Sequence, residues 1–368
     1  MDNKIIIVAP LSSISKRVRL FKLTKFLNNL GVKRFEHIAW EREKGESAEQ
    51  GLNFELQKTI ILRGGGHGGI KARLMYFPWM LKVFFKSFKI KKTDIVWVLG
   101  FESAFPMLLA SKIKGFKMYF DDTDRFSMVI QLPFPLNKLI EKLEKITSRN
   151  VYKHIIPTKE RYDFESDNFF ILHNTPSRTE IDAAFDLYKQ KEWIKARVII
   201  NINGWLGESR GMAVALKLYE MLEKEDVGFI LAGRLDCKAA ELLVKKDKVQ
   251  YLGRVSNAEA LASYFASDFV FTYYDPKRKI NQLAASNKWG DAIFTNTGII
   301  VNNEVKTAAF FIENNVAISY PYNDKDGLAN EIRAYCNNSE KIETIKENIN
   351  NLQTKIFCFE EQLQNLFE

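Results

Sequence analysis

Short apolar runs alternate with amphipathic segments along most of the chain. Runs such as 4–9, 93–99 and 198–202 are rich in β-branched residues and end in loops that contain proline, glycine or asparagine, which is typical of buried parallel strands. Between such runs, segments such as 16–30 carry leucines at helical spacing, and Gly31 ends that segment. This alternation predicts an α/β protein with parallel sheets covered by helices.

Length and composition place the chain among globular proteins. It has 368 residues, which predicts about two domains, and it is 46% hydrophobic and 27% charged. Its three cysteines are widely spaced and form no CxxC pair, which fits a reducing cytoplasm and argues against a disulfide framework. The four histidines show no HxxxH or HxH spacing, so we expect no structural zinc site.

The charge balance indicates an anionic partner. The formal net charge is +9, which favours nucleic acid, a membrane surface or a phosphorylated substrate. No nucleic-acid motif accompanies it, so we rank the membrane surface first. The first ten residues are too strand-like for a signal peptide, and no run of eighteen apolar residues exists. We therefore expect a cytoplasmic protein that binds peripherally to the inner face of the membrane.

Residues 71–92 are the candidate membrane segment. Basic and aromatic residues interleave there, and Pro78 starts or kinks a helix. Trp79, Val83 and Phe84 form one predicted face, while lysines form another, a combination that suits the headgroups of an anionic bilayer. The alternative is a helix that packs in the core and exposes its lysines.

A loop-to-helix junction at 281–303 carries the clearest chemistry. Ser286 is a candidate N-cap for a short helix. Free N–H groups at such a helix start attract anions, and Lys288 adds a positive charge. Asp291, one turn further on, suits a diol such as ribose. An anion-binding site beside a carboxylate that can accept hydrogen bonds from a diol indicates a nucleoside diphosphate. The alternative is an ordinary helix start with a favourably placed acid.

Three predicted loops in the first half also follow strands. Ser13 and Arg17 follow the first strand, where open α/β sheets bind ligands; simple helix capping by Ser15 is the alternative. His67 lies among five glycines, in a loop that either closes on a ligand or is a mobile surface loop. The segment 121–125 holds three carboxylates, which need water, a cation or a ligand.

The segment Ser286-Asn287-Lys288-x-x-Asp291-Ala-Ile resembles the proline-asparagine-lysine-x-x-glutamate-alanine motif of retaining GT-B glycosyltransferases of family 4. The resemblance implies that Asp291 binds the donor ribose and that the basic and backbone groups approach the pyrophosphate. Serine replaces the motif's proline, aspartate replaces its glutamate, and the family's upstream glutamate falls on Leu283.

Further segments resemble the same family in order and spacing. The segment 203–211, with Gly204 and Arg210, resembles the phosphate-binding glycine-arginine-leucine … lysine-glycine segment, although Trp205 stands where arginine is usual. The segments 227–234 and 249–255 resemble the family's valine-glycine turn and leucine-glycine strand. The resemblance implies donor-binding residues Gly204, Trp205, Arg210, Arg234, Arg254, Val255, Ser286, Asn287, Lys288 and Asp291.

The resemblance implies a GT-B fold, with two Rossmann-like domains whose parallel sheets face a cleft. Residues 1–176 would bind acceptor through Ser13, Arg17, His67 and Asp122. Residues 177–195 would be a partly helical linker. Residues 196–345 would bind a UDP- or GDP-linked sugar, and 346–368 would return to the first domain as the C-terminal helix.

The implied activity is that of a hexosyltransferase of bacterial surface-polysaccharide synthesis. It would transfer a sugar with retention to a hydroxyl of a glycan or lipid-linked acceptor, with Arg210 and Lys288 stabilising the leaving phosphate and no metal. A non-catalytic scaffold or sugar-binding protein and a nucleotide-sugar epimerase remain alternatives. A hydride-transfer enzyme is disfavoured, because no GxGxxG follows the first strand. The oligomeric state stays open.

Overall fold

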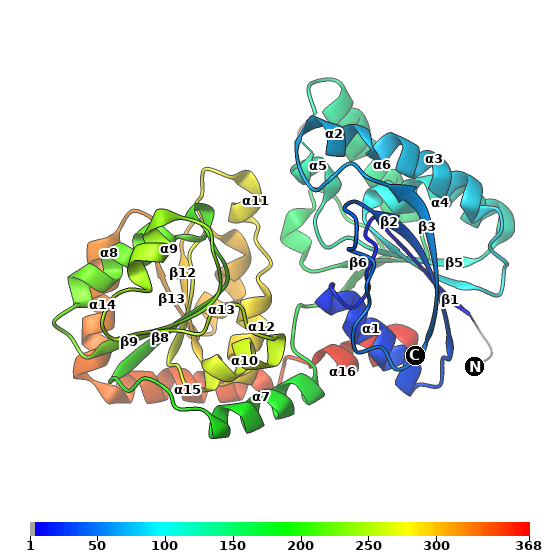
Figure 1. Ribbon diagram of the computed structural model, residues 1–368. Coiled ribbons are helices and arrows are strands. Elements are labelled where there is room, and N and C mark those ends of the chain that lie inside the picture. The colour runs from blue at the N-terminus through cyan, green and yellow to red at the C-terminus, as the bar shows by residue number, and fades with distance from the viewer. Residues whose placement is uncertain (1–3, 131) are drawn as a thin grey trace. The chain divides into compact units, whose positions relative to one another are not determined.

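The computed structural model describes residues 4–130 and 132–368 and contains two parallel sheets covered by helices (Figure 1). The chain divides into two compact units. Unit 1 comprises the chain up to Leu172 together with Leu363–Glu368, and unit 2 comprises His173–Gln362. The predicted α/β class with two Rossmann-like sheets is confirmed.

Unit 1 contains a seven-stranded sheet in the order β3-β2-β1-β4-β5-β6-β7, in which all neighbours run parallel. β1 lies at the centre, where Val8 pairs with Ile38 on one side and Val98 on the other. All five β1 residues are buried, because helices cover both faces. The strands are β1 (Ile5–Ala9), β2 (Arg34–Glu41), β3 (Glu55–Arg63), β4 (Ile95–Leu99), β5 (Lys117–Asp121), β6 (Lys153–Ile156) and β7 (Phe169–Ile171).

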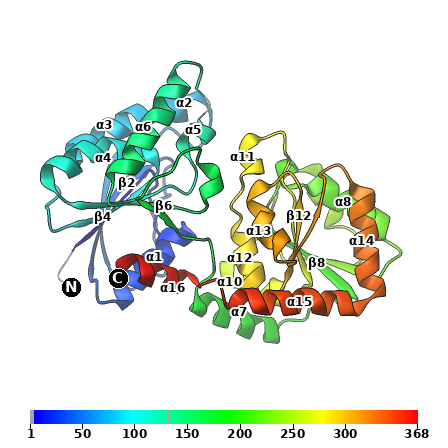
Figure 2. The ribbon, with the colours of Figure 1, turned by 180° about the vertical axis from the view of Figure 1, so that it is seen from behind.

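Helices cover the two faces of this sheet unequally (Figures 1 and 2). α1 (Val18–Asn29) and the end of α16 (Phe359–Phe367) lie on one face, where the Phe367 ring lies 6.3 Å from Phe26 and 5.5 Å from Tyr119. The opposite face carries the other helices of unit 1. They are α2 (Gly69–Leu74), α3 (Tyr76–Ser87), α4 (Phe101–Lys114), α5 (Phe126–Val129) and α6 (Leu136–Asn150), with the 3-10 turn η1 (Lys159–Arg161) in the loop before β7.

The sequence pattern predicts a helix over 105–113 after the strand at 93–99, but α4 begins four residues earlier, at Phe101. Gly100 has φ 77°, a conformation that favours glycine, and it turns the chain directly from β4 into the helix. The first turn of α4 therefore lies at the carboxyl end of β4 and contains Glu102.

Unit 2 contains a six-stranded parallel sheet in the order β10-β9-β8-β11-β12-β13. β8 extends beyond its predicted end at 202, so residues 203–206, expected to form a loop, belong to the strand. Gly204 and Gly233 pair there, and a Cβ on Gly233 would lie 1.8 Å from the Gly204 carbonyl oxygen. Only glycine permits this approach. The strands are β8 (Val198–Leu206), β9 (Val227–Leu235), β10 (Val249–Tyr251), β11 (Phe269–Thr272), β12 (Gly298–Asn302) and β13 (Ala317–Tyr320).

The helices of unit 2 enclose its sheet on both faces. One face is covered by α8, α9 and α14, and the other by α7, α10, α12 and α15 (Figures 1 and 2). Their bounds are α7 (Arg178–Gln190), α8 (Met212–Leu222), α9 (Lys238–Leu243), α10 (Asn257–Phe265), α11 (Lys279–Gln282), α12 (Asn287–Phe294), α13 (Ala309–Glu313), α14 (Lys325–Asn337) and α15 (Ser339–Gln353), with the 3-10 turns η2 (Glu208–Arg210) and η3 (Lys306–Ala308).

Two segments outside the predicted domain cores differ from their predicted places. Residues 177–195 contain α7, which packs against α10 inside unit 2. The C-terminal segment 346–368, expected to form one helix on the first domain, is shared between two helices, α15 and α16. α15 belongs to unit 2, because Ile342, Ile345 and Ile349 lie in the core of that unit. The part that joins unit 1 begins at Leu363.

The two faces of α3 also differ from the prediction. Trp79 and Val83, expected to face lipid, are buried in the core. A second apolar face, formed by Phe77, Leu81 and Phe85, is 57–71% exposed. The described part of the chain contains no helix that is long and apolar enough to cross a membrane.

Candidate functional site

Each sheet has one central position where the strand order reverses. In unit 1 this position lies between β1 and β4, and in unit 2 between β8 and β11. Open α/β sheets bind ligands at the carboxyl ends of strands beside such a position. A cavity lies at this place in each unit, and we name them the unit-1 pocket and the unit-2 pocket.

The unit-2 pocket has a volume of about 70 Å³ and is lined from the ends of β8 and β11. Three residues predicted to bind the donor, Trp205, Arg210 and Lys288, line it together. A fourth, Gly204, lies beside it, since a Cβ on Gly204 would be 3.5 Å from Lys288 Nζ. Two cationic side chains from distant segments thus lie around one small cavity, and such a cavity suits a phosphate group.

The N-terminus of α12 supports this pocket. Ser286 is the N-cap, and its Oγ accepts a hydrogen bond from the Lys288 backbone N–H at 3.3 Å. The Tyr274 hydroxyl, from the end of β11, donates to the same Oγ at 2.8 Å. Asn287 is the first helical residue. Because the helix start carries partial positive charge, it adds to the charge of Lys288.

Arg210 reaches the pocket from the last residue of η2. Gly211 follows with φ 71°, and a Cβ there would lie 2.5 Å from the Tyr273 Cβ, so glycine permits the close packing of η2 on β11. The Arg210 guanidinium lies 4.8 Å from the Tyr274 ring centroid and 5.9 Å from that of Trp205. These cation–π contacts hold the charge without neutralising it.

Asn203 is a pocket residue that the sequence analysis missed. It is 7% exposed, and its Nδ2 donates to the Ala260 carbonyl at 3.0 Å. Its Oδ1 is buried without a hydrogen-bond partner in the described part of the chain. A buried amide oxygen of this kind suits a ligand hydroxyl. The residue escaped notice because β8 was expected to end before it.

The other predicted donor residues lie outside the cavity lining. Arg234, at the end of β9, pairs with Asp236 at 2.6 Å, and the Trp205 indole N–H donates to the same carboxylate at 2.5 Å. Arg254 is exposed and Val255 half-buried after β10. Asp291 lies one turn into α12. Burial raises the pKa of Tyr264, and the Asp291 charge adds to that shift, so the carboxylate lies near this buried ring.

The unit-1 pocket is larger, with a volume of about 470 Å³. Three of the four predicted acceptor residues, Ser13, Arg17 and His67, line it. They come from the loop after β1 and from the glycine-rich loop after β3. The volume lies in the range that small-molecule sites occupy.

The loop after β1 is held by Glu49. Its carboxylate accepts hydrogen bonds from Ser13 Oγ and from the Ser15 backbone N–H, both at 2.9 Å, and pairs with Lys58 at 2.6 Å. Burial acts to raise the pKa of Glu49, but Lys58 and these donors lower it to about 2. The Ser13 hydroxyl thus positions the loop. Its neighbour Ser12 is 2% exposed, and its Oγ has no partner in the described residues.

Glu102 is the second pocket residue that the sequence analysis missed. It is 8% exposed and lines the cavity. Burial raises its pKa to about 7, and the nearby Asp122 charge adds to that effect, while Arg42 and Arg17 oppose it. A carboxylate at the carboxyl end of a strand was the available signal, but the expected start of α4 at 105 placed Glu102 in a loop.

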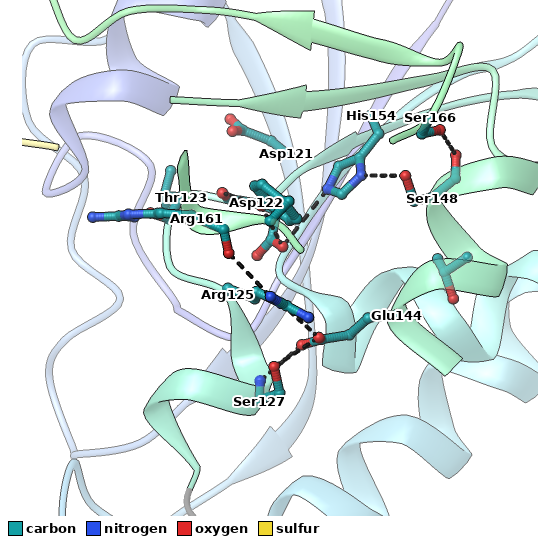
Figure 3. A network of polar contacts seen from close by, with 12 residues as sticks. Asp121, Asp122, Thr123, Arg125, Ser127, Glu144, Ser148, His154, Arg161 and Ser166 are labelled. Atoms are coloured by element: carbon teal, nitrogen blue, oxygen red, sulfur yellow. Dashed lines mark hydrogen bonds and ion pairs between the residues drawn. The ribbon is translucent and has the colours of Figure 1, made fainter. Parts of the chain in front are cut away.

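Asp122 lies in a buried network beneath the pocket (Figure 3). It is 1% exposed, and its Oδ2 accepts a hydrogen bond from the Tyr162 hydroxyl at 2.8 Å and lies 3.6 Å from His154 Nε2. Burial lowers the pKa of His154, which fits a neutral ring. Asp122 was expected to bind the acceptor, but it is absent from the cavity lining. Thr123 and Asp124 line the cavity instead.

A second part of the network fixes the loop after β5 (Figure 3). Arg125 pairs with Glu144 at 3.0 Å and with Asp163 at 2.8 Å. The Ser127 hydroxyl donates to the same Glu144 carboxylate at 2.7 Å. Asp121 pairs with Arg19 at 3.0 Å, and burial raises its pKa. The acids at 121 and 122 are therefore structural partners of neighbouring side chains.

His67 lies at the rim of the unit-1 pocket. Its ring contacts the Glu46 carboxylate, and Glu43 is close enough that the three side chains form a group that could hold a metal ion. Two of the three are exposed. Exposed acidic groups commonly occur without a metal, so the geometry alone assigns none.

Comparisons with known proteins show the fold. No family model matches the sequence, and no curated protein matches it significantly. Among solved structures, the N-terminal domain of Candida albicans trehalose-6-phosphate phosphatase is similar with a TM-score of 0.70 and 13% identity, over 100% of this chain and 96% of that one. WaaG, a glycosyltransferase involved in lipopolysaccharide biosynthesis, has a TM-score of 0.63 and 14% identity, over 98% of each chain. S. aureus MnaA, solved with UDP, has a TM-score of 0.55 and 15% identity, over 94% of this chain and 91% of that one.

These neighbours are similar over nearly the whole length of the chain, both sheets included. The chain has the GT-B fold. Because the sequence identities are only 13–15%, the structural similarity shows the fold and does not by itself show the activity.

Proposed function

We propose that the protein is a glycosyltransferase that moves a hexose from a nucleoside diphosphate sugar to an acceptor hydroxyl. The supporting observation is the unit-2 pocket, in which Arg210 and Lys288 lie together at the reversal point of the sheet. In this proposal unit 2 binds the donor and unit 1 binds the acceptor, and no metal takes part.

The two cations would act on the leaving group. As the bond between the sugar and the diphosphate breaks, negative charge grows on the leaving phosphate. Arg210, Lys288 and the N-terminus of α12 would stabilise that charge, and such preorganised electrostatics commonly supply the largest part of catalysis. Asp291 would accept hydrogen bonds from the donor ribose, and we propose that the anomeric configuration is retained.

The nucleotide is proposed to be UDP or GDP. MnaA, whose structure is similar, was solved with UDP, which makes UDP the first nucleotide to test. The unit-2 pocket of about 70 Å³ accounts for one phosphate group, so the base would lie outside it, towards Arg254 and Val255 after β10.

The acceptor is proposed to be a glycan or a lipid-linked molecule at the inner face of the cytoplasmic membrane. WaaG is involved in lipopolysaccharide biosynthesis. The exposed face of α3, formed by Phe77, Leu81 and Phe85, would enter the bilayer surface.

A non-catalytic GT-B protein is the second candidate. Trp205 replaces one cation of the related motif, and Leu283 replaces its upstream carboxylate. Measuring the release of nucleoside diphosphate from UDP- and GDP-sugars separates the two candidates, because glycosyltransferases slowly hydrolyse their donors without acceptor.

We expect hydrolysis of one donor by the wild type and at least a tenfold lower rate for Arg210→Ala, because the growing phosphate charge loses a cation. Lys217→Ala, which removes an exposed cation of α8 that pairs with Glu220 on the same helix, should keep the wild-type rate. Donor binding without turnover in the wild type would favour the non-catalytic candidate, and an unchanged rate for Arg210→Ala would remove Arg210 from the mechanism.

A further inference from the structure

The floor of the unit-1 pocket carries polar groups that lack partners. Glu102 is more than nine-tenths buried and lines the cavity. Apart from its own backbone N–H, no donor in the described part of the chain hydrogen-bonds its carboxyl group. Ser12 Oγ is likewise buried without a partner there. Buried polar groups are normally hydrogen-bonded, so an open cavity beside Ser12 and the sparsely bonded Glu102 carboxyl group indicates a ligand that supplies further bonds.

The backbone fixes the direction of Glu102. A Cβ built on Gly100 would lie 2.7 Å from Glu102 Oε2, so the carboxyl group folds back over the start of α4. Gly100 has φ 77°, which favours glycine, and no side chain there competes for the space. The carboxyl group therefore lies at the junction of β4 and α4, beside the reversal point of the sheet.

The rim of the same pocket is cationic. Lys16 and Arg17 are exposed and line the cavity. The Lys16 ammonium donates to the Glu46 backbone carbonyl at 2.9 Å, which leaves its charge uncompensated. The Arg17 side chain has no hydrogen bond or ion pair within residues 4–130 and 132–368. The acid Asp124, which also lines the pocket, is already paired with Arg161 at 3.4 Å.

We propose that the unit-1 pocket binds an anionic polyol, whose hydroxyl groups hydrogen-bond Glu102 and Ser12 and whose negatively charged substituent pairs with Lys16 and Arg17. A simple anion would be repelled by Glu102, and a neutral sugar would leave both cations unused. A sugar phosphate or a sugar acid has both groups, and it fits a cavity of about 470 Å³. The inference rests on the proposed function only in making this ligand the acceptor.

Calorimetry with a fixed panel tests the proposal: glucose 6-phosphate, glucose 1-phosphate, mannose 6-phosphate and glucuronate, with glucose and inorganic phosphate as the two separate halves. At least one anionic sugar should bind at least tenfold more tightly than either half. Glu102→Gln and Arg17→Ala should each weaken that binding about tenfold. Lys33→Ala, which removes an exposed cation of unit 1 outside the pocket lining, should have no effect.

The pH dependence distinguishes contact by Glu102 from a general effect of folding. Glucuronate keeps its charge between pH 6 and 8, so a change in affinity over this range comes from the protein. The charged groups near Glu102 are Asp122, Arg42 and Arg17, and the side chains of Glu46, His67 and Asp124 also line the pocket. If the carboxylate accepts hydrogen bonds from the ligand, wild-type affinity rises through this range and Glu102→Gln affinity stays flatter.

Failure of every panel member to bind, or equal binding by the wild type, Glu102→Gln and Arg17→Ala, would overturn the proposal. Donor hydrolysis depends on unit 2 and is measured without these ligands. Hydrolysis without anionic-sugar binding would therefore reject this inference alone, and sugar binding without hydrolysis would reject the proposed function alone.

Discussion

Glu102 shows how much a single side chain depends on its surroundings. A glutamate with a usual pKa of 4.5 is shifted to about 7 mainly because it is buried beside a cavity. A shift of this size corresponds to roughly 3 kcal/mol of differential stability between its two protonation states. Strongly shifted pKa values cluster at functional sites, and Glu102, unlike Asp121, lines a cavity.

The stability of the protein should therefore depend on pH through Glu102. Because its pKa is raised on folding, the native state binds more protons than the unfolded state between pH 4.5 and about 7. Glu102 therefore costs no stability below pH 4.5, where it is protonated in both states. The free energy of unfolding falls as the pH rises from 4.5 through about 7, and the loss is constant at higher pH. Glu102→Gln lacks this titration, so it should gain up to roughly 3 kcal/mol relative to the wild type between pH 5 and pH 8.

Urea unfolding of both proteins without ligand at pH 5, 6, 7 and 8 gives the comparison. Other titrating groups are common to the two proteins and cancel in the difference. A difference in unfolding free energy that stays constant over this range would show that Glu102 ionises normally in the folded protein.

Single residues were predictable from sequence where a local motif positions them. Lys288 and Ser286 lie in one helix start, and Arg210 directly precedes a predicted helix, so their neighbourhood followed from local pattern. Asn203 and Glu102 were missed because each depended on one element boundary. Asp122 was misplaced because a run of acids in the sequence does not reveal which of them lies under the surface.

At the scale of elements, the periodicity of the sequence predicts helix α3, whereas packing determines which of its faces is buried. The sequence identified an amphipathic, basic and aromatic helix, and that helix exists. It has two apolar faces, and the sequence alone could not tell which would meet the sheet. Trp79 and Val83 meet it, because Trp79 packs against Trp40 at 5.9 Å and donates to Ser103 Oγ at 3.1 Å.

Exposed apolar side chains also occur on the helix beside α3. α3 packs beside α4, and α4 beside α6. Leu109 and Ile113 on α4 are 55% and 63% exposed. Among the charged residues of these helices, lysines outnumber acids, and the exposed lysines include Lys112, Lys114, Lys138 and Lys142. An apolar surface rimmed by cations is suited to an anionic bilayer.

The protein should therefore sediment with vesicles that contain anionic phospholipid, and less so with purely zwitterionic ones. Phe77→Ser combined with Phe85→Ser should reduce the bound fraction severalfold at low salt, because both rings are mostly exposed and contribute little to the core. High salt should weaken binding through screening. Equal binding by the double variant and the wild type would locate the membrane contact elsewhere.

At the scale of the whole molecule, two sheets that share the order of their first six strands each have a polar cavity at the strand reversal. The order of strands and helices was readable from sequence, because buried parallel strands are continuous apolar runs. The sequence did not show how the last thirty residues divide between the two units, because α15 and α16 have similar amphipathic patterns. Only tertiary packing shows that α15 lies in the core of unit 2 and that Phe367 lies in unit 1.

The central claim is that the unit-2 pocket binds a nucleoside diphosphate. Calorimetry of the wild type and Lys288→Ala with UDP, GDP, ADP and CDP tests it most directly. The account predicts saturable binding of UDP or GDP by the wild type and at least tenfold weaker binding by Lys288→Ala, a loss of about 1.4 kcal/mol or more. Lys217→Ala should bind like the wild type. If none of the four nucleotides binds, or if Lys288→Ala binds as tightly as the wild type, the claim is contradicted.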